Sequence, residues 1–185
     1  WNNIALSASL HSRDFDLEKV VSESSGRLVS ISGIRRAGKS SLLMLLHRKL
    51  ISMNRKSVYV NMEDDRLKFE TSLDEVLKSA GNAEWLLLDE VTNAKRWVNW
   101  LHRLNEVKTP HLVVSSSLNS LSTNPPKPLR GRVSIFELFP LSFKEFLVFS
   151  QQVKQALGKK RSETLVDFLI YGGFNKPKDQ QNGGK

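Results

Sequence analysis

Short apolar runs alternate with longer amphipathic segments along the chain. Five of these runs consist mainly of leucine, valine and isoleucine, and each has the length of a strand. Runs that lack a regular polar position suit strands whose two faces are both covered. They predict strands at residues 28–32, 58–61, 85–89, 111–115 and 133–138.

The segments between and around these runs repeat apolar residues at helical spacing. The clearest covers residues 40–52, where leucine recurs every three or four positions. Ser142 with Glu145 three residues later forms a capping box, which predicts the start of another helix. Helices are predicted at residues 14–22, 40–52, 71–80, 95–107, 142–157 and 162–171. Alternating strands and helices indicate an α/β fold with a parallel sheet.

Length and composition fit one domain with a small appendage. The chain has 185 residues, of which 39 % are hydrophobic and 25 % are charged, so it can bury a core. The last eleven residues contain no apolar side chain. We expect a helical lead-in at 1–27, an α/β core at 28–142, a helical lid at 143–174 and a disordered tail at 175–185.

Cysteine is absent, which excludes disulfides, zinc–thiolate sites, iron–sulfur clusters and a cysteine nucleophile. No apolar run approaches the roughly 20 residues of a membrane helix, and the first residues lack the features of a signal peptide. We therefore expect a cytoplasmic protein without a membrane partner.

The charge of the chain favours anionic partners. The net charge is +9, and the basic surplus lies in the first 60 and last 65 residues, on either side of an acidic middle. Such a surplus attracts nucleic acid, acidic lipid or nucleotide phosphate. A merely solvated basic surface is the alternative, and charge alone does not choose between them.

A glycine-rich segment between the first predicted strand and the next helix carries the strongest chemical signal. Its sequence, GIRRAGKS at 33–40, satisfies G-x-x-x-x-G-K-[ST]. Glycines let successive N–H groups turn inward around an anion, and the helix start adds its positive end. We expect Lys39 to reach the β- and γ-phosphates of ATP and the Ser40 hydroxyl to coordinate Mg²⁺. The predicted nucleotide-binding residues are Gly33, Arg36, Ala37, Gly38, Lys39, Ser40 and Ser41, with a solvated side chain as the alternative for Arg36.

Two adjacent acids end the third predicted strand. After a phosphate-binding loop, Asp89 is expected to hold Mg²⁺ through a water, and Glu90 to act as general base on the attacking water. The alternative is that they merely begin the next helix. The pair favours hydrolysis over transfer to a substrate hydroxyl, and no Asn-Lys-x-Asp motif indicates a GTPase.

Three serines follow the fourth predicted strand, at residues 115–117. A polar side chain at this position can bridge the attacking water and the γ-phosphate. One of the first two serines is expected to do so, and Ser116 is the predicted catalytic residue. An ordinary polar loop is the alternative.

Six motifs follow one another in a fixed order: GIRRAGKS at 33–40, YVNMED at 59–64, LDEVTN at 88–93, SSS at 115–117, LRGR at 129–132 and PLSFKEF at 140–146. In this order they resemble the bacterial and archaeal AAA-type P-loop ATPases. The resemblance implies an additional-strand parallel sheet of order 5-1-4-3-2, ATP as ligand and a helical lid. It also implies that Arg130 or Arg132 serves as a γ-phosphate sensor or as a finger offered to a neighbouring subunit, so a homo-oligomer is a candidate; a solvated basic loop is the alternative.

Three functional hypotheses follow. The first is an ATP-hydrolysing switch or motor module. The second is a regulatory module that binds nucleotide and a protein partner with little turnover. The third adds nucleic acid as a partner of the basic ends. Proteins of the resembling family usually continue into a large C-terminal domain, so we expect a separate effector domain or protein partner to supply the output.

Overall fold

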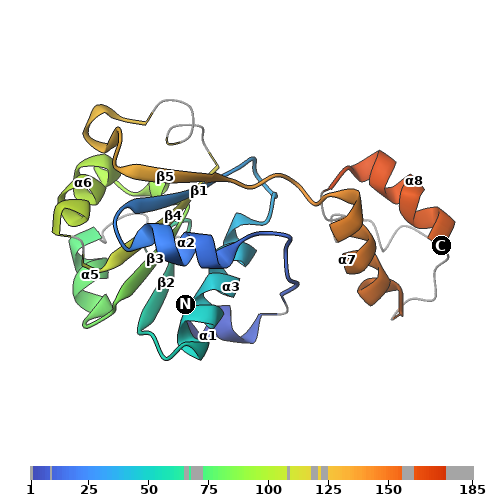
Figure 1. The fold of residues 1–185 in the computed structure, drawn as a ribbon, viewed down its shortest axis with the longest axis horizontal. Helices are drawn as coiled ribbons and strands as arrows, with labels where there is room; N and C mark the ends of the chain where they lie inside the picture. Colours follow the sequence, from blue (N-terminus) through green and yellow to red (C-terminus); the bar gives the residue numbers. More distant parts are fainter. Residues whose placement is uncertain are drawn as a thin grey trace. The chain divides into compact units, whose positions relative to one another are not determined.

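A five-stranded parallel sheet organises the first part of the chain (Figure 1). The computed structural model describes residues 2–8, 10–64, 67, 73–107, 109–117, 121, 125–155 and 161–173. The strands are β1 (Leu28–Ser32), β2 (Ser57–Asn61), β3 (Trp85–Asp89), β4 (His111–Ser116) and β5 (Val133–Glu137). Their order, β2-β3-β4-β1-β5, is the predicted order counted from the other edge. The predicted α/β fold and strand order are therefore confirmed.

The register of the strands brings their carboxyl ends together at one edge of the sheet. Ser32 at the end of β1 pairs with Ser116 at the end of β4, and Asn61 pairs with Asp89 at the end of β3. We call this edge the carboxyl edge. Because all strands are parallel, the residues that follow β1, β3 and β4 emerge there together.

Helices cover both faces of the sheet. One face is covered by α1 (Asn2–Ser7), α2 (Leu17–Ser24) and α3 (Lys39–Ser52), and the other by α5 (Leu73–Ala80) and α6 (Trp97–Val107). Two short 3₁₀ turns, η1 (Val91–Asn93) and η2 (Lys127–Leu129), lie in the connections. The sequence did not predict α1.

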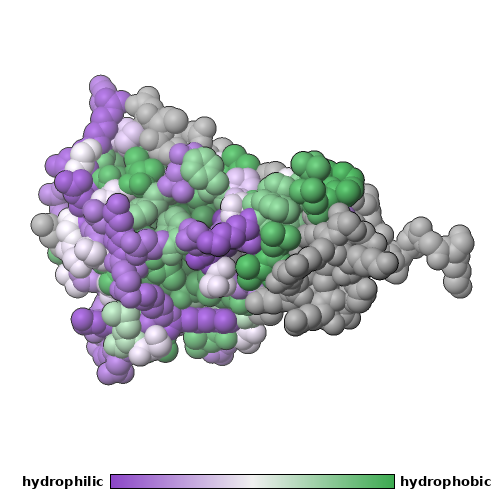
Figure 2. Space-filling view, turned by 45° about the vertical axis from the view of Figure 1, so that its right-hand side comes forward, coloured by the Kyte–Doolittle hydropathy of each residue, from purple (hydrophilic) through white to green (hydrophobic). Residues whose placement is uncertain are grey.

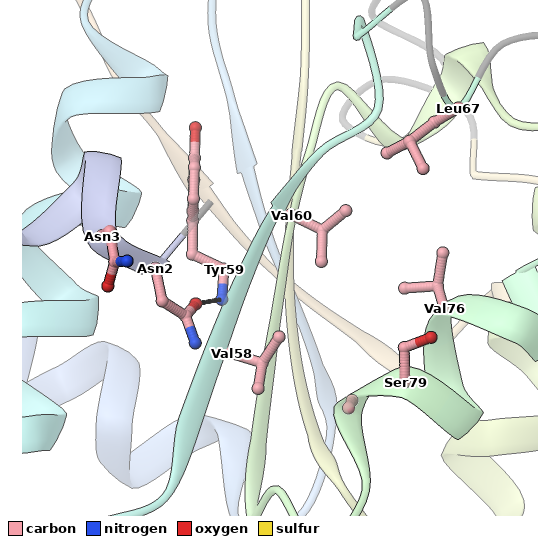
Figure 3. A pocket seen from close by; sticks show the side chains of 9 residues that line it. Asn2, Asn3, Val58, Tyr59, Val60, Leu67, Val76 and Ser79 are labelled. Atoms are coloured by element: carbon pink, nitrogen blue, oxygen red, sulfur yellow. Dashed lines mark hydrogen bonds between the residues drawn. The ribbon is translucent and has the colours of Figure 1, made fainter.

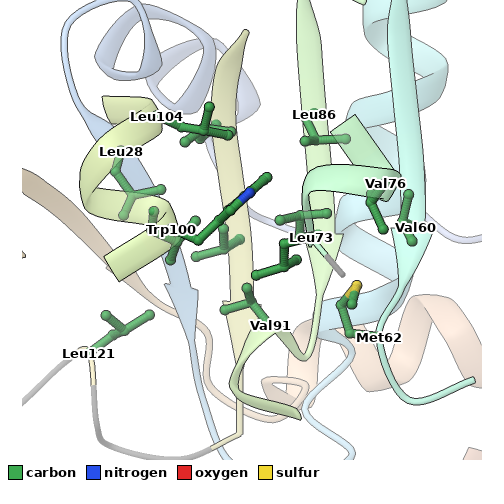
Figure 4. Packing of buried hydrophobic residues seen from close by; sticks show 14 of the residues in the cluster. Leu28, Val60, Met62, Leu73, Val76, Leu86, Val91, Trp100, Leu104 and Leu121 are labelled. Atoms are coloured by element: carbon green, nitrogen blue, oxygen red, sulfur yellow. The ribbon is translucent and has the colours of Figure 1, made fainter. Parts of the chain in front are cut away.

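Alternation along the strands divides the apolar residues into two cores. Val29 and Ile31 of β1 pack with the leucines of α3, whereas Leu28 packs with Trp100 of α6 on the opposite face (Figure 4). Successive side chains of a strand point to opposite faces, so fully buried strands need apolar residues at consecutive positions. This requirement explains why the strands can be recognised in the sequence as continuous apolar runs.

The chain divides into two compact units, Trp1–Leu138 and Phe139–Lys185. The second contains α7 (Phe143–Gln155) and α8 (Arg161–Tyr171). The predicted capping box is formed: Glu145 Oε2 accepts from Ser142 N at 2.8 Å, and Ser142 Oγ accepts from Glu145 N at 3.2 Å. The two helices meet through Phe168, whose ring centroid lies 5.1 Å from that of Phe143. The predicted tail at 175–185 lies outside the described residues.

Several large apolar side chains stay exposed, above all on α8: Leu165, Val166, Leu169 and Ile170. Figure 2 shows hydrophobic surface beside hydrophilic surface on one face of the molecule. Within the described ranges, every helix is too short or too polar to cross a bilayer.

Candidate functional site

The loop between β1 and α3, residues 33–38, begins and ends with glycines that the backbone requires. We call it the phosphate loop. A Cβ on Gly33 would lie 2.3 Å from the Leu138 carbonyl oxygen, closer than real atoms approach. Gly38 has φ +97° and caps α3 at its N-terminus, a conformation that costs glycine nothing. Arg36, an exposed residue, adopts φ +67° in the same loop.

Lys39, the first residue of α3, turns its side chain back under this loop. The side chain is 3 % exposed, and its ammonium donates to the carbonyl oxygens of Gly33 at 3.0 Å and Ile34 at 3.2 Å. It also donates to Ser117 Oγ at 2.7 Å and lies 3.2 Å from Glu90 Oε1. A buried ammonium needs such partners to offset its lost hydration. Lys39 therefore joins the phosphate loop to the ends of β3 and β4.

Glu90 is held from two sides at the carboxyl edge. Its carboxylate accepts from the backbone N–H of Ser117 at 2.9 Å and from the Ser117 hydroxyl, and it faces Lys39. Its own N–H donates to Ser115 Oγ at 2.9 Å. The backbone of Glu90 is left-handed, with φ +52°, which is uncommon for a residue with a side chain and is found at functional sites.

Asp89 is 1 % exposed, and each of its carboxylate oxygens has a donor. Tyr59 of β2 donates its hydroxyl to Oδ2 at 2.8 Å, and the Ser115 hydroxyl donates to Oδ1. Burial, and then the neighbouring Asp89 carboxylate, raise the pKa of Tyr59 well above its ordinary value. The phenol therefore stays protonated and keeps donating to Asp89.

Tyr59 itself is fixed from the outer edge of the sheet. Its backbone N–H donates to Asn2 Oδ1 at 2.9 Å, so the first turn of α1 supplies an acceptor for a backbone N–H of the edge strand β2 (Figure 3).

A pocket of about 370 Å³ lies at this edge, lined by residues of α1, β2 and α5 and by Leu67. None of the phosphate-loop residues lines it. Figure 3 shows Tyr59 on the α1 side of β2 and Val60 on the α5 side.

The donors at the carboxyl edge suit a divalent cation that keeps most of its other ligands from phosphate and water. Ser40 offers a hydroxyl at the start of α3, and Asp89 offers a carboxylate at the end of β3. In the described part of the chain, no three or more His, Asp or Glu side chains gather closely enough to hold a metal alone. Magnesium is usually held by one or two carboxylates together with substrate phosphates, so Ser40 and Asp89 fit it.

The phosphate loop, Lys39 and the two acids at the carboxyl edge form the arrangement expected of a P-loop protein. The family described as an AAA domain matches residues 25–147. The chain belongs to this AAA family. An "Uncharacterized protein MJ1544" of Methanocaldococcus jannaschii is 31 % identical over 92 % of this chain and 40 % of its own length. An "Uncharacterized protein" of Haemophilus influenzae is 29 % identical over 78 % of this chain and 38 % of its own. The chain thus spans about two fifths of these relatives.

Solved structures confirm the fold of this AAA domain. A DNA replication initiation factor superposes with a TM-score of 0.59 at 14 % identity, over 86 % of this chain and 55 % of that one. DnaA from Aquifex aeolicus bound to AMPPCP gives 0.56 at 16 % identity, over 83 % and 53 %. A replication initiator DnaA bound to AMPPCP and single-stranded DNA gives 0.55 at 14 %, over the same shares. These matches show that the sheet and its helices have the fold of these proteins, and the family itself is shown by the AAA-domain match.

Two serines of the 115–117 stretch contact the acids and the lysine of the site. Ser115 and Ser117 of the AAA domain contact Asp89, Glu90 and Lys39. Ser116 is fully buried, and by strand alternation it shares the face of Val114, which packs in the core under α5 and α6. Ser115, one of the two serines expected from the sequence, therefore lies beside both acids, and the catalytic role of Ser116 stays a prediction.

The structure does not bring Arg130 or Arg132 to the phosphate loop of the same chain. Both arginines precede β5, whereas the loop follows β1. Because β1 and β5 are parallel, the arginines lie at the amino ends of the strands and the loop lies at their carboxyl ends. Arg132 Nε donates to Glu106 Oε1 at 3.0 Å, and Arg130 Nε donates to the Pro125 carbonyl at 3.1 Å. A γ-phosphate sensor within the chain has no support from this geometry. A finger offered to a neighbouring subunit stays a prediction.

Sequence reasoning missed Tyr59 and Ser117 as parts of the site. A signal for Tyr59 was present, because a phenol in a buried strand needs a partner and the next strand ends in Asp89. No sequence signal separates Ser117 from Ser116, since the choice depends on which face each serine meets. Ser40 and Ser41 lie half-buried at the start of α3, as the motif places them.

Proposed function

We propose that this AAA domain binds ATP at the phosphate loop and hydrolyses it, and that loss of the γ-phosphate changes the conformation of the chain. The observation that carries the proposal is the convergence of Lys39, Glu90 and Ser117 beside the loop, with the Lys39 ammonium 3.2 Å from Glu90 Oε1. A buried cation next to a carboxylate, at a glycine loop and a helix start, suits a triphosphate and an attacking water.

Lys39 and the loop supply binding. The Lys39 ammonium exchanges some of its present acceptors, the carbonyls of Gly33 and Ile34 and the Ser117 hydroxyl, for oxygens of the β- and γ-phosphates. The N–H groups of the loop and of the first turn of α3 hold the α- and β-phosphates. Ser40 and Asp89 would hold Mg²⁺, which neutralises charge that develops on the phosphate oxygens.

Glu90 supplies the base. In the proposed step a water oxygen bonds to the γ-phosphorus while the bond from that phosphorus to the bridging oxygen breaks, and ADP and phosphate leave. Glu90 accepts a proton from the water, and Ser117 and Lys39 orient its carboxylate. Tyr59 and Ser115 keep Asp89 fixed one residue away.

The alternative is a regulatory module that binds nucleotide and a partner with little turnover. It is favoured by the engagement of the Glu90 carboxylate with Lys39 and Ser117, which must be rearranged before Glu90 reaches a water. Nucleic acid is a candidate partner, supported by the net charge of +9 and by the fold shared with a DnaA that was solved with single-stranded DNA. A homo-oligomer that uses Arg130 or Arg132 of a neighbour belongs to the same set of proposals.

Replacement of Glu90 by Gln tests turnover. We expect phosphate release to fall by about a hundredfold or more, because a general base contributes about 10²- to 10⁴-fold, while ATP affinity holds. Glu84→Gln is the matched control, since Glu84 is also paired with a cation, Arg55, but lies just before β3, at the opposite end of that strand from Glu90. Wild-type protein that binds ATP but releases no phosphate, with Glu90→Gln indistinguishable from it, favours the regulatory alternative.

Nucleic-acid binding is tested with single- and double-stranded DNA and with RNA over a salt series. Phosphate contacts make affinity fall steeply as salt rises. A flat response, or no binding at low salt, removes this partner from the proposal.

A further inference from the structure

The segment ahead of α2 reaches the phosphate loop through one arginine. Arg13 Nη1 donates to the Ala37 carbonyl oxygen at 2.7 Å, across 24 residues of sequence. A Cβ on Gly38 would lie 3.0 Å from the same nitrogen. The guanidinium of the half-buried Arg13 therefore lies against the peptide bond that joins Ala37 to Gly38. Neither the sequence motifs nor the comparisons assign Arg13 a role.

This contact determines which way one N–H of the loop points. A trans peptide is planar, and its carbonyl and N–H point in opposite directions. Because Arg13 holds the Ala37 carbonyl on its own side, the Gly38 N–H must point away from Arg13. Gly38 tolerates the left-handed φ of +97° that this orientation requires. Without the guanidinium, the Ala37 carbonyl would lose this donor, and a rotation of the peptide that turned the carbonyl toward an anion would repel phosphate.

The segment that carries Arg13 is itself held in place. Two residues later, the ring of Phe15 packs against Phe136 of β5, with centroids 6.0 Å apart. Asp16 then caps α2 by accepting from Lys19 N at 2.9 Å. Ala37 is 3 % exposed, and its N–H donates to the Ile34 carbonyl at 3.2 Å, which fixes the preceding peptide of the loop. Arg13 thus joins two parts that each have little freedom.

We propose that Arg13 is a positioning residue of the anion site: it holds the Ala37–Gly38 peptide so that the Gly38 N–H is directed to the α- and β-phosphates of a bound nucleotide. This inference rests on the proposed function. It places a determinant of nucleotide affinity before β1, outside the loop motif itself.

The experiment measures binding of ATP and of ADP, each with magnesium chloride, to the 185-residue chain by calorimetry. The variants are Arg13→Ala and Arg13→Lys. The control is Arg48→Ala, because Arg48 also ties the N-terminal region to the core through a backbone carbonyl, that of Ala5 at 3.0 Å, but lies away from the loop. Thermal unfolding is recorded for each protein, and Arg13→Gln, which keeps a neutral donor, replaces Arg13→Ala if the latter does not fold.

We expect Arg13→Ala to weaken ATP and ADP binding alike by about tenfold to a hundredfold, the worth of one charged hydrogen bond. Both nucleotides are affected because both carry the phosphates that the loop N–H groups hold. Arg13→Lys keeps the charge and a donor and is expected to restore most of the affinity. Arg48→Ala is expected to lower thermal stability without changing affinity.

The outcomes separate the two proposals. If the wild type binds and folded Arg13→Ala binds equally well, or loses no more than Arg48→Ala, the role of Arg13 is overturned and the proposed function stands. A loss for ATP without a loss for ADP also overturns it, because Arg13 would then act on the γ-phosphate. A wild type that binds neither nucleotide overturns both proposals.

Discussion

The hydroxyl of Tyr59 provides a direct test of how the Asp89 carboxylate is held. It donates to Asp89 Oδ2 at 2.8 Å, and both side chains are buried. Tyr59→Phe removes the hydroxyl, leaves the ring in place and deprives a buried carboxylate oxygen of its donor. A hydrogen bond to a charged group contributes about 1.5–3 kcal/mol. We therefore expect the free energy of unfolding to fall by about 2 kcal/mol at neutral pH.

The raised pKa of Tyr59 gives this variant a pH signature. Burial, and then the Asp89 carboxylate, hold the pKa above its ordinary value of 10.0, so the folded chain keeps the proton in a range where the unfolded chain loses it. The unfolded chain then binds fewer protons, and stability falls as pH rises. The contribution of Tyr59 is complete below about pH 10 and declines above it by up to about 1.4 kcal/mol per pH unit. The difference between wild type and Tyr59→Phe should shrink accordingly.

Urea unfolding at about pH 8 and about pH 11 measures both effects. Tyr171→Phe is measured in parallel, because Tyr171 is the other tyrosine of the chain and lies in the second unit. Two results would refute the reasoning: equal unfolding free energies for wild type and Tyr59→Phe at the lower pH, or a difference that stays constant at the higher one.

Three further predictions concern other parts of the first unit. Ser117→Ala removes the hydroxyl between Lys39 and Glu90, the proposed general base, so phosphate release at saturating ATP should fall about tenfold, and unchanged release contradicts the proposal. Gly33→Ala places a Cβ 2.3 Å from the Leu138 carbonyl and should lower the unfolding free energy by about 3 kcal/mol or more. In Gly131→Ala the added Cβ meets no atom within 4 Å, so the unfolding free energy should fall only by the strain of the left-handed backbone, about 1 kcal/mol. Equal losses of stability for Gly33→Ala and Gly131→Ala in thermal unfolding contradict this prediction. Burial lowers the pKa of His47, so stability should fall as pH drops below about 6.5, where the unfolded chain binds a proton that the folded chain does not. His47→Gln should flatten that decline in urea unfolding, and a wild type whose stability does not change from about pH 7.5 to about pH 5.5 contradicts the prediction.

The sheet and the phosphate loop could be predicted because their physical causes are local. Strands covered on both faces must be apolar at consecutive positions, and residues 28–32 and 85–89 form strands with the predicted bounds. The loop motif is equally local, since glycines permit its backbone and the helix that follows faces the anion. Helix α6 begins at Trp97 instead of residue 95, because Arg96 adopts φ +56° just before it.

The contacts within the site could not be predicted, because they depend on how strands are placed beside one another. Whether Ser115, Ser116 or Ser117 meets the acids depends on which face of β4 each occupies relative to β3, and this is a property of the folded sheet. Tyr59 reaches Asp89 only because β2 pairs in parallel with β3. Arg13 reaches the loop from 24 residues upstream, with no motif to indicate it.

The side chains that contact Asp89 lie on the face of the sheet that α1, α2 and α3 cover. Tyr59 lies in the core under α1, α2 and α3 together with Leu87 and Val113, and strand alternation puts Asp89 and Ser115 on that same face. The opposite face carries the apolar core under α5 and α6, and by strand alternation it also carries the buried Ser30, Ser32 and Ser116 toward the carboxyl edge. The same side of the sheet therefore holds the start of α3 with Lys39 and the two hydroxyls, of Tyr59 and Ser115, that donate to Asp89. Arg13, placed just before α2, belongs to this layer and reaches the phosphate loop from the same side of the sheet.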